Sequence, residues 1–536
     1  MSVLVTAVGA QVEAEVKARL RSPATVVAFG ALLVASYFWI PDPQGRVSSL
    51  SWEGADGVTR APLYNSAYLG IATALLSGIF LVMASFYFVA GSVRKDRETG
   101  IGAILAATPL PSGAYLLGKW AANAAYILVL ACLALPVGFY AFFRFGEGPF
   151  EPLRLAGPLL LNVLPAASFV AATALLFDVT PGLKGQGGLV VGFFASMFVL
   201  IALPAQLAGG FEGKEGRLRR QPLFDPAGSM TMNLWIQQSL PEVPKSVSTG
   251  LIFHDKPMQR VRWNGFPFTF RMALLRLSSL VWTLPMLGLA LLFFDRFDPA
   301  RGRLRMGRGA KAAEARVEAS SVPVPALALS QLRSVAPHPS AWLSVLAEAR
   351  LIWDTASFLK WPLAASALVG AFLPAAGSAG VTAAFLVLLV PVISEVAARE
   401  EIAGTRSLVF AQPGVPKSAV LWKLASVSVF LAAVASPLLL RALLQAATAP
   451  IRLFALATGL LFVAAFAVSA GWLTGGGKLF SGVYVALWYT AVNRVPAFDV
   501  TGSFAPTTAP VHLTYAAIGA ALVGIALGIE KKRAAA

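Results

Sequence analysis

The stretch that decides the fold reads Arg94-Lys95-Asp96-Arg97-Glu98-Thr99-Gly100 and continues to Pro109 and Lys119. It is a dense cluster of charges between two apolar runs, each long enough to cross a bilayer. The same pattern returns as Arg399-Glu400-Glu401-Ile402-Ala403-Gly404-Thr405 and continues to Pro413 and Lys423. A shift of 304 positions superposes the glycines, prolines and lysines of the two copies. A pattern that recurs in this way predicts that the chain consists of two halves of one design.

The composition predicts a membrane protein. Of the 536 residues, 57% are hydrophobic and 13% are charged, and the mean hydropathy is +0.71. A soluble domain carries about 25% charged residues, and one of this size could not bury so much apolar surface. The net charge of +17 fits the excess of Lys and Arg in cytoplasmic loops of membrane proteins. We expect no nucleic-acid partner, because no basic patch with interleaved aromatic residues occurs.

The order of the apolar runs predicts an all-α polytopic membrane protein with about 12 transmembrane helices, arranged as two parallel six-helix repeats. An amphipathic elbow helix precedes each repeat, at residues 1–22 and at about 342–354. The expected spans are 24–40, 66–91, 114–143, 155–177, 187–207 and 272–294, then 361–374, 380–396, 419–446, 453–472, 479–489 and 511–529. Six plus six spans place both termini on one side of the membrane, and the basic clusters identify that side as the cytoplasm.

Three regions follow from this reading. Residues 1–295 form the first half and include a polar extracytoplasmic segment at about 209–269. Residues 296–340 are a basic cytoplasmic linker, because they combine many arginines with a Val-Pro-Val-Pro step. Residues 341–536 form the second half.

Few residues suggest a disulfide, a metal site, a phosphate-binding loop or a catalytic site. One cysteine (Cys132) and three dispersed histidines predict neither an internal disulfide nor a metal site. The run 475–479 reads Gly-Gly-Gly-Lys-Leu and lacks the hydroxyl residue of a phosphate-binding loop. The 209–269 segment holds Asp225, Glu242, His254 and Asp255, but no spacing among them is diagnostic of catalysis. A substrate gate or a docking site for an extracytoplasmic partner is the favoured hypothesis for this segment.

Polar residues inside the apolar runs have simple interpretations. Arg144, Arg271, Arg276 and Arg441 lie toward the ends of spans, where an arginine can extend its charged group to the membrane surface. Asn123 and Asn162 are candidates for hydrogen bonds between helices. The charged stretch itself continues with apolar residues at helical spacing until Pro109, which predicts a short cytoplasmic helix that a soluble partner could push.

The pattern resembles the permease subunit of ABC-2 type transporters. In that family an elbow helix and two spans lead to a loop of the form acid-Arg-acid-x-Gly-Thr, followed by Pro and Gly-Lys. Here Asp96-Arg97-Glu98-Thr99-Gly100, Thr108-Pro109 and Gly118-Lys119 fit the pattern. In the second half Glu400, Gly404-Thr405, Pro413 and Lys423 fit. Ile101, Ile402 and Trp422 depart from it, and the loss of the second acid predicts unequal coupling by the two halves.

The resemblance implies that each charged loop is a coupling helix, which sits in a groove of a separate cytoplasmic ABC ATPase. Two copies of the ATPase would bind ATP and Mg, so the chain itself is expected to bind no cofactor or metal and not to be an enzyme. The fused chain would be a complete permease pair that exports a substrate across the cytoplasmic (inner) membrane, in contact with membrane lipid. The implied coupling residues are Asp96, Arg97, Glu98, Gly100, Pro109, Lys119, Glu400, Glu401, Gly404, Pro413 and Lys423.

Two other function classes stay open. Parallel repeats also occur in carriers driven by ion gradients, although the spans show no carboxylate near mid-membrane. A membrane scaffold or enzyme that uses the 209–269 segment is the third hypothesis. Transport without an ATPase would favour the carrier, and activity lost with the outer segment alone would favour the scaffold or enzyme.

Overall fold

The structure is a computed structural model. It describes residues 2–22, 25–26, 29–30, 47–181, 183, 188, 191–192, 195–196, 198–207, 222–254, 258–267, 269–297, 341–356, 359–410 and 418–535. The predicted span 24–40 lies mostly outside these residues, as does the predicted linker. The predicted span 187–207 is described only in pieces, which include the π-helix Phe198–Ala202 and α10 (Leu203–Leu207).

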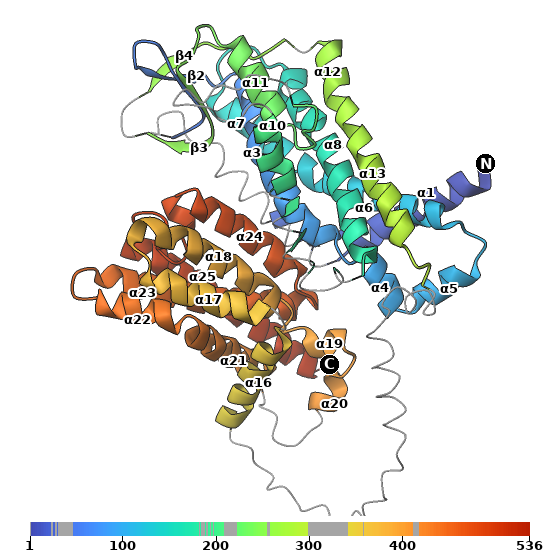
Figure 1. The fold of residues 1–536 in the computed structure, drawn as a ribbon, viewed down its shortest axis with the longest axis vertical. Coiled ribbons are helices and arrows are strands. Elements are labelled where there is room, and N and C mark those ends of the chain that lie inside the picture. The colour runs from blue at the N-terminus through green and yellow to red at the C-terminus, as the bar shows by residue number, and fades with distance from the viewer. Residues whose placement is uncertain are drawn as a thin grey trace, which may run out of the picture. The chain divides into compact units, whose positions relative to one another are not determined.

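The chain divides into two compact units. The first comprises residues 1–101 and 108–294, and the second comprises residues 102–107 and 295–536. The break after Phe294 lies beside the predicted end of the first half at 295. Figure 1 shows that both units consist mainly of helices.

Helices of the first unit pack around α8, which is largely buried. α3, α6 and α13 pack against α8, and α1 packs against α6. Asn65 begins α3 by accepting a hydrogen bond from the backbone N–H of Tyr68 at 2.9 Å. The helices are α1 (Ser2–Leu20), α3 (Ser66–Val89), α4 (Ser92–Glu98), α6 (Ser112–Cys132), α7 (Ala134–Phe145), α8 (Pro152–Val179), α11 (Ser229–Ser239), α12 (Phe270–Leu277), the 3-10 turn Ser278–Trp282 and α13 (Thr283–Phe293). α5 (Ile101–Ala107) follows α4 in the chain, but its residues 102–107 belong to the second unit.

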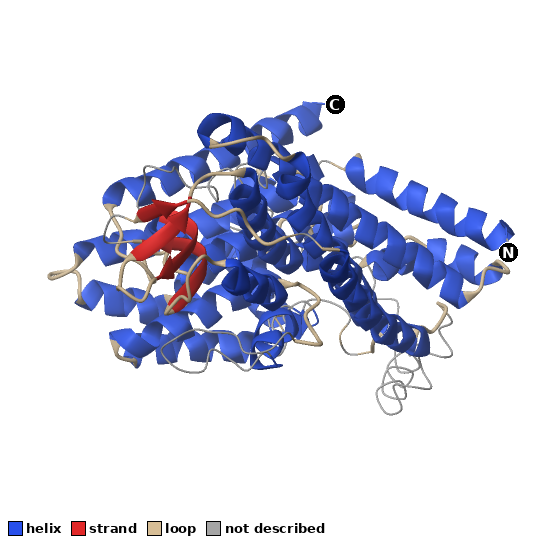
Figure 2. Ribbon diagram, turned by 90° about the horizontal axis from the view of Figure 1, so that it is seen from above, coloured by secondary structure: helices blue, strands red, loops and turns tan. Residues whose placement is uncertain are grey.

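A four-stranded sheet belongs to the first unit (Figure 2). Its strands are β1 (Val47–Glu53), β2 (Thr59–Pro62), β3 (Ser246–Phe253) and β4 (Gln259–Val261), in the order β3-β1-β2-β4. β1 pairs antiparallel with β2 and with β3, whereas β2 pairs parallel with β4. The all-α prediction omits this sheet. The loop before α3 supplies β1 and β2, and the 209–269 segment supplies β3 and β4. Neither stretch therefore contains the whole sheet.

The second unit has α23 near its centre, in contact with α21, α22, α24 and α25. α16 packs against α21, as α1 packs against α6 in the first unit. Pro450 occupies the first turn of α23 and a left-handed Gly475 follows its last residue. The helices are α16 (Ala341–Thr355), α17 (Lys360–Phe372), α18 (Ala375–Ile393), α19 (Arg399–Ile402), α20 (Arg406–Phe410), α21 (Ala419–Val434), α22 (Ser436–Leu444), α23 (Pro450–Thr474), α24 (Lys478–Val492), the 3-10 turn Pro496–Phe498 and α25 (Ala509–Ala535).

Several helices identify the chain as a membrane protein. Among the described residues five are long and apolar enough to cross a bilayer: 112–145, 152–179, 270–293, 450–474 and 509–532. The predicted single span 419–446 is instead two helices, α21 and α22, which meet at 66° and together would count as a sixth. Pro437, in the first turn of α22, cannot donate a backbone hydrogen bond to the preceding turn, which explains the bend. The total of twelve transmembrane helices stays a prediction.

The elbow helices form where they are expected. On α1, however, apolar and polar side chains are not separated onto opposite faces. Its attachment to α6 relies on polar groups, such as Gln11, whose amide donates to the backbone oxygen of Tyr115 at 3.2 Å. The prediction of a helix at 1–22 is therefore confirmed, and the face that packs on α6 carries polar as well as apolar side chains.

Candidate functional site

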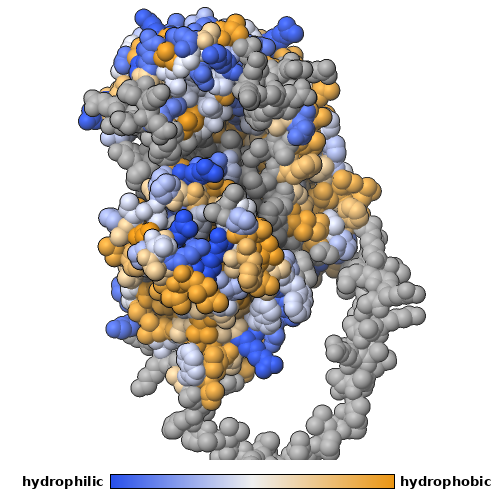
Figure 3. Space-filling model, turned by 60° about the vertical axis from the view of Figure 1, so that its left-hand side comes forward, coloured by the Kyte–Doolittle hydropathy of each residue, from blue (hydrophilic) through white to orange (hydrophobic). Residues whose placement is uncertain are grey.

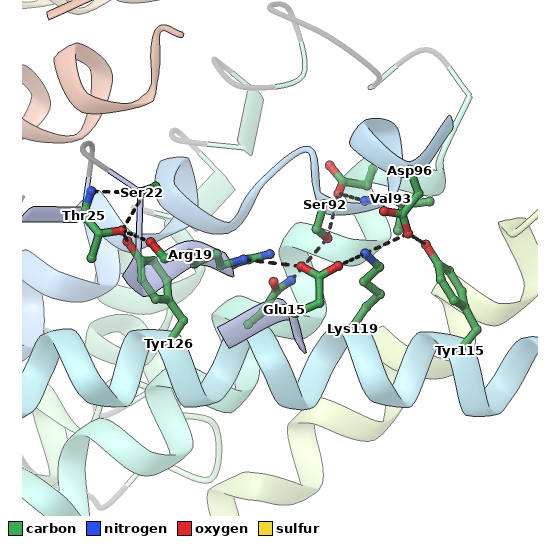
Figure 4. A network of polar contacts seen from close by, with 12 residues as sticks. Glu15, Arg19, Ser22, Thr25, Ser92, Val93, Asp96, Tyr115, Lys119 and Tyr126 are labelled. Atoms are coloured by element: carbon green, nitrogen blue, oxygen red, sulfur yellow. Dashed lines mark hydrogen bonds and ion pairs between the residues drawn. The ribbon is translucent and has the colours of Figure 1, made fainter. Parts of the chain in front are cut away.

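The first ion cluster consists of Glu15, Asp96 and Lys119 (Figure 4). Lys119 extends from α6, and its ammonium forms ion pairs with Glu15 of α1 and, at 2.7 Å, with Oδ2 of Asp96 in α4. The lysine side chain is 2% exposed and that of Asp96 is 8% exposed. Charges removed from water to this degree are stable only when they are paired. The cluster therefore fixes three helices to one another.

Two neighbouring side chains complete the first ion cluster. The hydroxyl of Tyr115 donates a hydrogen bond of 2.6 Å to Oδ2 of Asp96. Arg19 approaches Glu15, with 3.7 Å between Nε and Oε2, and supplies the second positive charge that balances two carboxylates. Burial alone would raise the pKa of Glu15, but the hydrogen bond from Lys119 and the surrounding cations lower that pKa below its usual range. Glu15 is thus held as a carboxylate.

The charged helix α4 is also held at its N-terminal end. Asp178, near the end of α8, accepts hydrogen bonds from the backbone N–H of Gly91 at 2.6 Å and of Val93 at 3.2 Å. A carboxylate at this position satisfies free N–H groups and interacts favourably with the helix dipole. The hydroxyl of Ser92 donates to the same carboxylate at 3.3 Å. α4 is therefore attached to α8 as well as to α1 and α6.

The second ion cluster has the same construction in the second unit and consists of Glu348, Arg399, Glu400 and Lys423. Lys423 of α21 is 1% exposed and pairs with Glu348 of α16 at 2.8 Å. It also pairs with Glu400 of α19, whose side chain is 12% exposed. Arg399 lies 3.2 Å from Glu348 and balances the charge. Each cluster thus joins an elbow helix, a charged helix and the helix that carries the lysine, which is α6 or α21.

The two ion clusters differ in the source of their second cation. In the first cluster Arg19 comes from the elbow helix, whereas in the second Arg399 comes from the charged helix itself. Tyr115 corresponds to Ala419 in the 304-residue shift, so the second cluster has no equivalent hydroxyl at that position. The charged helices are consequently held by different contacts in the two units.

The predicted coupling residues fall into two groups. Asp96, Lys119, Glu400 and Lys423 lie inside the ion clusters, where they contact other helices of the chain. The others with described positions lie at the surface or in turns: Arg97, Glu98, Gly100, Pro109, Glu401 and Gly404. Gly100 and Gly404 both have left-handed backbone, with φ of 76° and 66°. Each separates a pair of short helices, so the predicted single helix is a helix–glycine–helix unit. Pro413 lies outside the described residues.

Three carboxylates of these networks, Glu15, Glu348 and Asp178, are absent from the predicted site residues, as are Arg19, Tyr115 and Arg399. Glu15 and Glu348 occupy matching places in the two elbow helices, which is a signal that the sequence contains. Asp178 gives no such signal, because it is a single carboxylate at the end of an apolar run.

A buried arginine and its polar neighbours serve the fold of the first unit. Arg276 is 1% exposed. The prediction that its charged group extends to the membrane surface is therefore wrong. Its guanidinium donates to the backbone oxygen of Asp225 at 2.8 Å and to Oδ1 of Asn162 at 3.1 Å. Asn162 therefore bonds between helices, as predicted. Burial raises the pKa of Asp225, which the positive charge of Arg276 opposes.

Two other candidate residues of the 209–269 segment, Glu242 and His254, also have structural partners. Glu242 accepts a hydrogen bond of 2.9 Å from the indole of Trp52, and His254 lies 2.9 Å from the hydroxyl of Ser48. Both contacts join the 209–269 segment to β1. Asp255 lies outside the described residues. Within the described ranges no three His, Cys, Asp or Glu side chains are grouped as metal ligands.

Comparison with models of known protein families, with curated proteins and with solved structures gave no match.

Proposed function

We propose that the chain is the permease of an ATP-driven exporter of the ABC-2 type. In this proposal two fused six-helix halves lie in the cytoplasmic (inner) membrane with both termini in the cytoplasm. Two copies of a separate ATPase bind ATP and Mg, and dock on α4–α5 and α19–α20. The basic residues of the charged stretches support a cytoplasmic location for these short helices.

The observation that carries the proposal is the presence of an ion cluster at each charged helix. Through Lys119 and Asp96, a displacement of α4 is transmitted to α6, because separating the pair would leave charges buried and unpaired. Lys423 and Glu400 connect α19 to α21 in the same way. A solvated loop between two spans would not need such attachments, whereas an element that receives force does.

The exposed side of α4 can be tested separately from the contacts that hold α4 against other helices. Arg97 and Glu98 are exposed, while Asp96 points into the first ion cluster. Reversal of Asp96 would disturb folding, so the informative variant is Arg97→Glu combined with Glu98→Lys. A matched control is Glu13→Lys with Lys17→Glu, which reverses an exposed ion pair on α1.

The experiment is co-expression of the chain with candidate ATPases, of which one encoded beside its gene is the first choice. We expect the ATPase to co-purify, and we expect ATP hydrolysis by the reconstituted complex to be lost in the Arg97/Glu98 variant. The Glu13/Lys17 control should keep both properties. Unchanged ATPase binding and hydrolysis in the Arg97/Glu98 variant would contradict the docking assignment.

One observation favours a carrier driven by an ion gradient as the second candidate. Buried carboxylates paired with lysine are also what a proton pathway uses, and both ion clusters have this composition. Such a carrier would work in vesicles that contain only this chain. Substrate movement that follows an imposed pH gradient and needs no ATPase would favour the carrier over the exporter.

A further inference from the structure

A cavity of about 670 Å³ lies in the second unit, at the end remote from α19 and Lys423. Its walls come from the end of α17, the first turns of α18, the region from α22 to the start of α23, and residues 501–507. Figure 1 shows α22 and α19 at opposite ends of this unit. Ligand cavities typically measure about 300–1,000 Å³, so the space suits a small molecule or a lipid headgroup.

Three arginines line this cavity: Arg441, Arg452 and Arg494. No aspartate or glutamate is among its described lining residues, and no carboxylate within the described ranges pairs with any of the three. Figure 3 shows hydrophilic side chains gathered in a hollow of the second unit with hydrophobic side chains around it. The nearby Asp499 is fully buried and accepts hydrogen bonds from three backbone N–H groups at positions 503–505. It braces the wall of the cavity at residues 503–505, and its carboxylate is occupied by these backbone groups.

Each arginine is positioned in a different way. Nη1 of Arg441 donates to the backbone oxygens of Gly370 and Leu373, at 2.7 and 2.8 Å, which orients its guanidinium at the end of α17. Arg452 belongs to the first turn of α23 and is exposed. Neither Arg452 nor Arg494 has a side-chain partner in the described part of the chain.

Arg494 occupies a strained position. Its φ is 61°, in the left-handed region that follows a helix and that glycine adopts at least cost. The backbone around it closes α24 with a hydrogen bond from Arg494 N to the oxygen of Ala491 at 2.8 Å. A strained residue points to a use for its side chain, and this side chain lines the positive cavity.

We propose that the cavity binds a phosphomonoester. Guanidinium groups recognise phosphate through paired, charge-assisted hydrogen bonds. A phosphomonoester carries a charge of about −1.5 to −2 at pH 7, which matches three arginines better than a carboxylate or a zwitterionic headgroup does. Leu438, Ile451 and Phe504 add apolar walls, so the phosphate can come from a lipid or from a soluble phosphorylated compound. This inference does not rest on the proposed function.

The test uses the full chain in a neutral detergent and titration calorimetry. Inorganic phosphate, dihexanoyl phosphatidic acid and dihexanoyl phosphatidylcholine serve as probes. We expect saturable binding of phosphatidic acid and none of phosphatidylcholine. Arg452→Gln and Arg494→Gln should each weaken binding about tenfold or more, as expected for loss of a charge-assisted hydrogen bond. Arg271→Gln, which removes an exposed arginine of the first unit, should leave binding unchanged.

A further variant separates binding from stability. Arg494→Gly should raise the melting temperature, because glycine relieves the left-handed backbone, and should weaken binding as much as Arg494→Gln. Phosphatidic acid that binds at least about tenfold more tightly than inorganic phosphate identifies a lipid as the source, and equal affinities identify a soluble compound. The proposal would be overturned if neither phosphatidic acid nor inorganic phosphate bound saturably. It would also be overturned if the wild type and the two glutamine variants bound phosphatidic acid equally well.

Discussion

The ammonium of Lys119 lies 2.7 Å from Oδ2 of Asp96, and neither side chain is more than 8% exposed. The same lysine also pairs with Glu15. One cation therefore neutralises carboxylates from two other helices, and its removal would leave both of them without their central partner. The pairing thus makes the short charged helix α4 part of the folded body of the first unit.

Replacement of Lys119 by methionine should destabilise the protein by about 3–5 kcal/mol, the cost of breaking a buried ion pair from one side. Lys423→Met should have a similar effect in the second unit, because Lys423 is equally buried. Lys95→Met removes an exposed lysine of α4 and is the control. Thermal unfolding in detergent measures all three.

The combined replacement Glu15→Gln, Asp96→Asn and Lys119→Met removes the charges together. It should recover much of the stability lost in Lys119→Met, since neutral groups of similar size do not require a buried counter-charge. If Lys119→Met were no less stable than Lys95→Met, the first ion cluster would not hold these helices together.

The loss of folding stability at low pH should depend on Glu15. Its pKa is lowered from the usual 4.5, so its ionised form stabilises the folded protein. That contribution is complete above about pH 4.5 and is lost as the pH falls through the lower pKa of the folded state. The melting temperature of Glu15→Gln should therefore change less below about pH 4.5 than that of the wild type. Glu147→Gln is the control, because Glu147 is an exposed carboxylate outside the first ion cluster. If the melting temperatures of wild type and Glu15→Gln fell equally below about pH 4.5, this assignment would be contradicted.

Hydrophobic runs predict the long helices well. The expected spans 155–177 and 453–472 correspond to α8 at 152–179 and α23 at 450–474. Such helices satisfy their backbone hydrogen bonds locally, so their apolar sequence is sufficient to identify them. The span expected at 419–446 shows the limit of this reasoning. Its length and apolarity are right, but Pro437 divides it.

Contacts between distant segments are what the sequence does not reveal. The strand pair of β1 and β3 joins Trp52 to Val247, and neither strand contains a signal for its partner. Arg276 looks like a surface arginine by its position near a span end, yet it fills a polar site built by Asn162 and the loop at Asp225. In the ion clusters, sequence spacing identifies Asp96 and Lys119 as a repeated pair. The reason for their burial is the glutamate of the elbow helix, which only the folded chain brings to them.

The left-handed glycines between the short helices should resist substitution. Gly100 has φ of 76° and Gly404 has φ of 66°, and a Cβ added at either would meet open space. Alanine at each position should therefore cost about 1 kcal/mol through backbone strain alone. Asparagine should cost less, because it tolerates the left-handed conformation.

The control for these variants is Gly113→Ala. Gly113 lies inside α6, and a Cβ there also meets nothing within 4 Å. Alanine should stabilise this helical position by up to about 1 kcal/mol. Thermal unfolding of the three alanine variants gives the comparison. Equal effects at Gly100 and Gly113 would show that the helix–glycine–helix geometry is not needed.

Glu98 and Val243 should lie on opposite sides of the membrane. In the proposed topology the basic residues around α4 put Glu98 in the cytoplasm and the segment 209–269 on the other side. Val243 precedes β3 in that segment and is 69% exposed. Single cysteines at these positions, introduced into a Cys132→Ala background, report this directly. A membrane-impermeant maleimide should label Val243→Cys in intact cells and should label Glu98→Cys only after the membrane is opened. Labelling of both cysteines in intact cells would contradict the topology and, with it, the access of a cytoplasmic ATPase to α4.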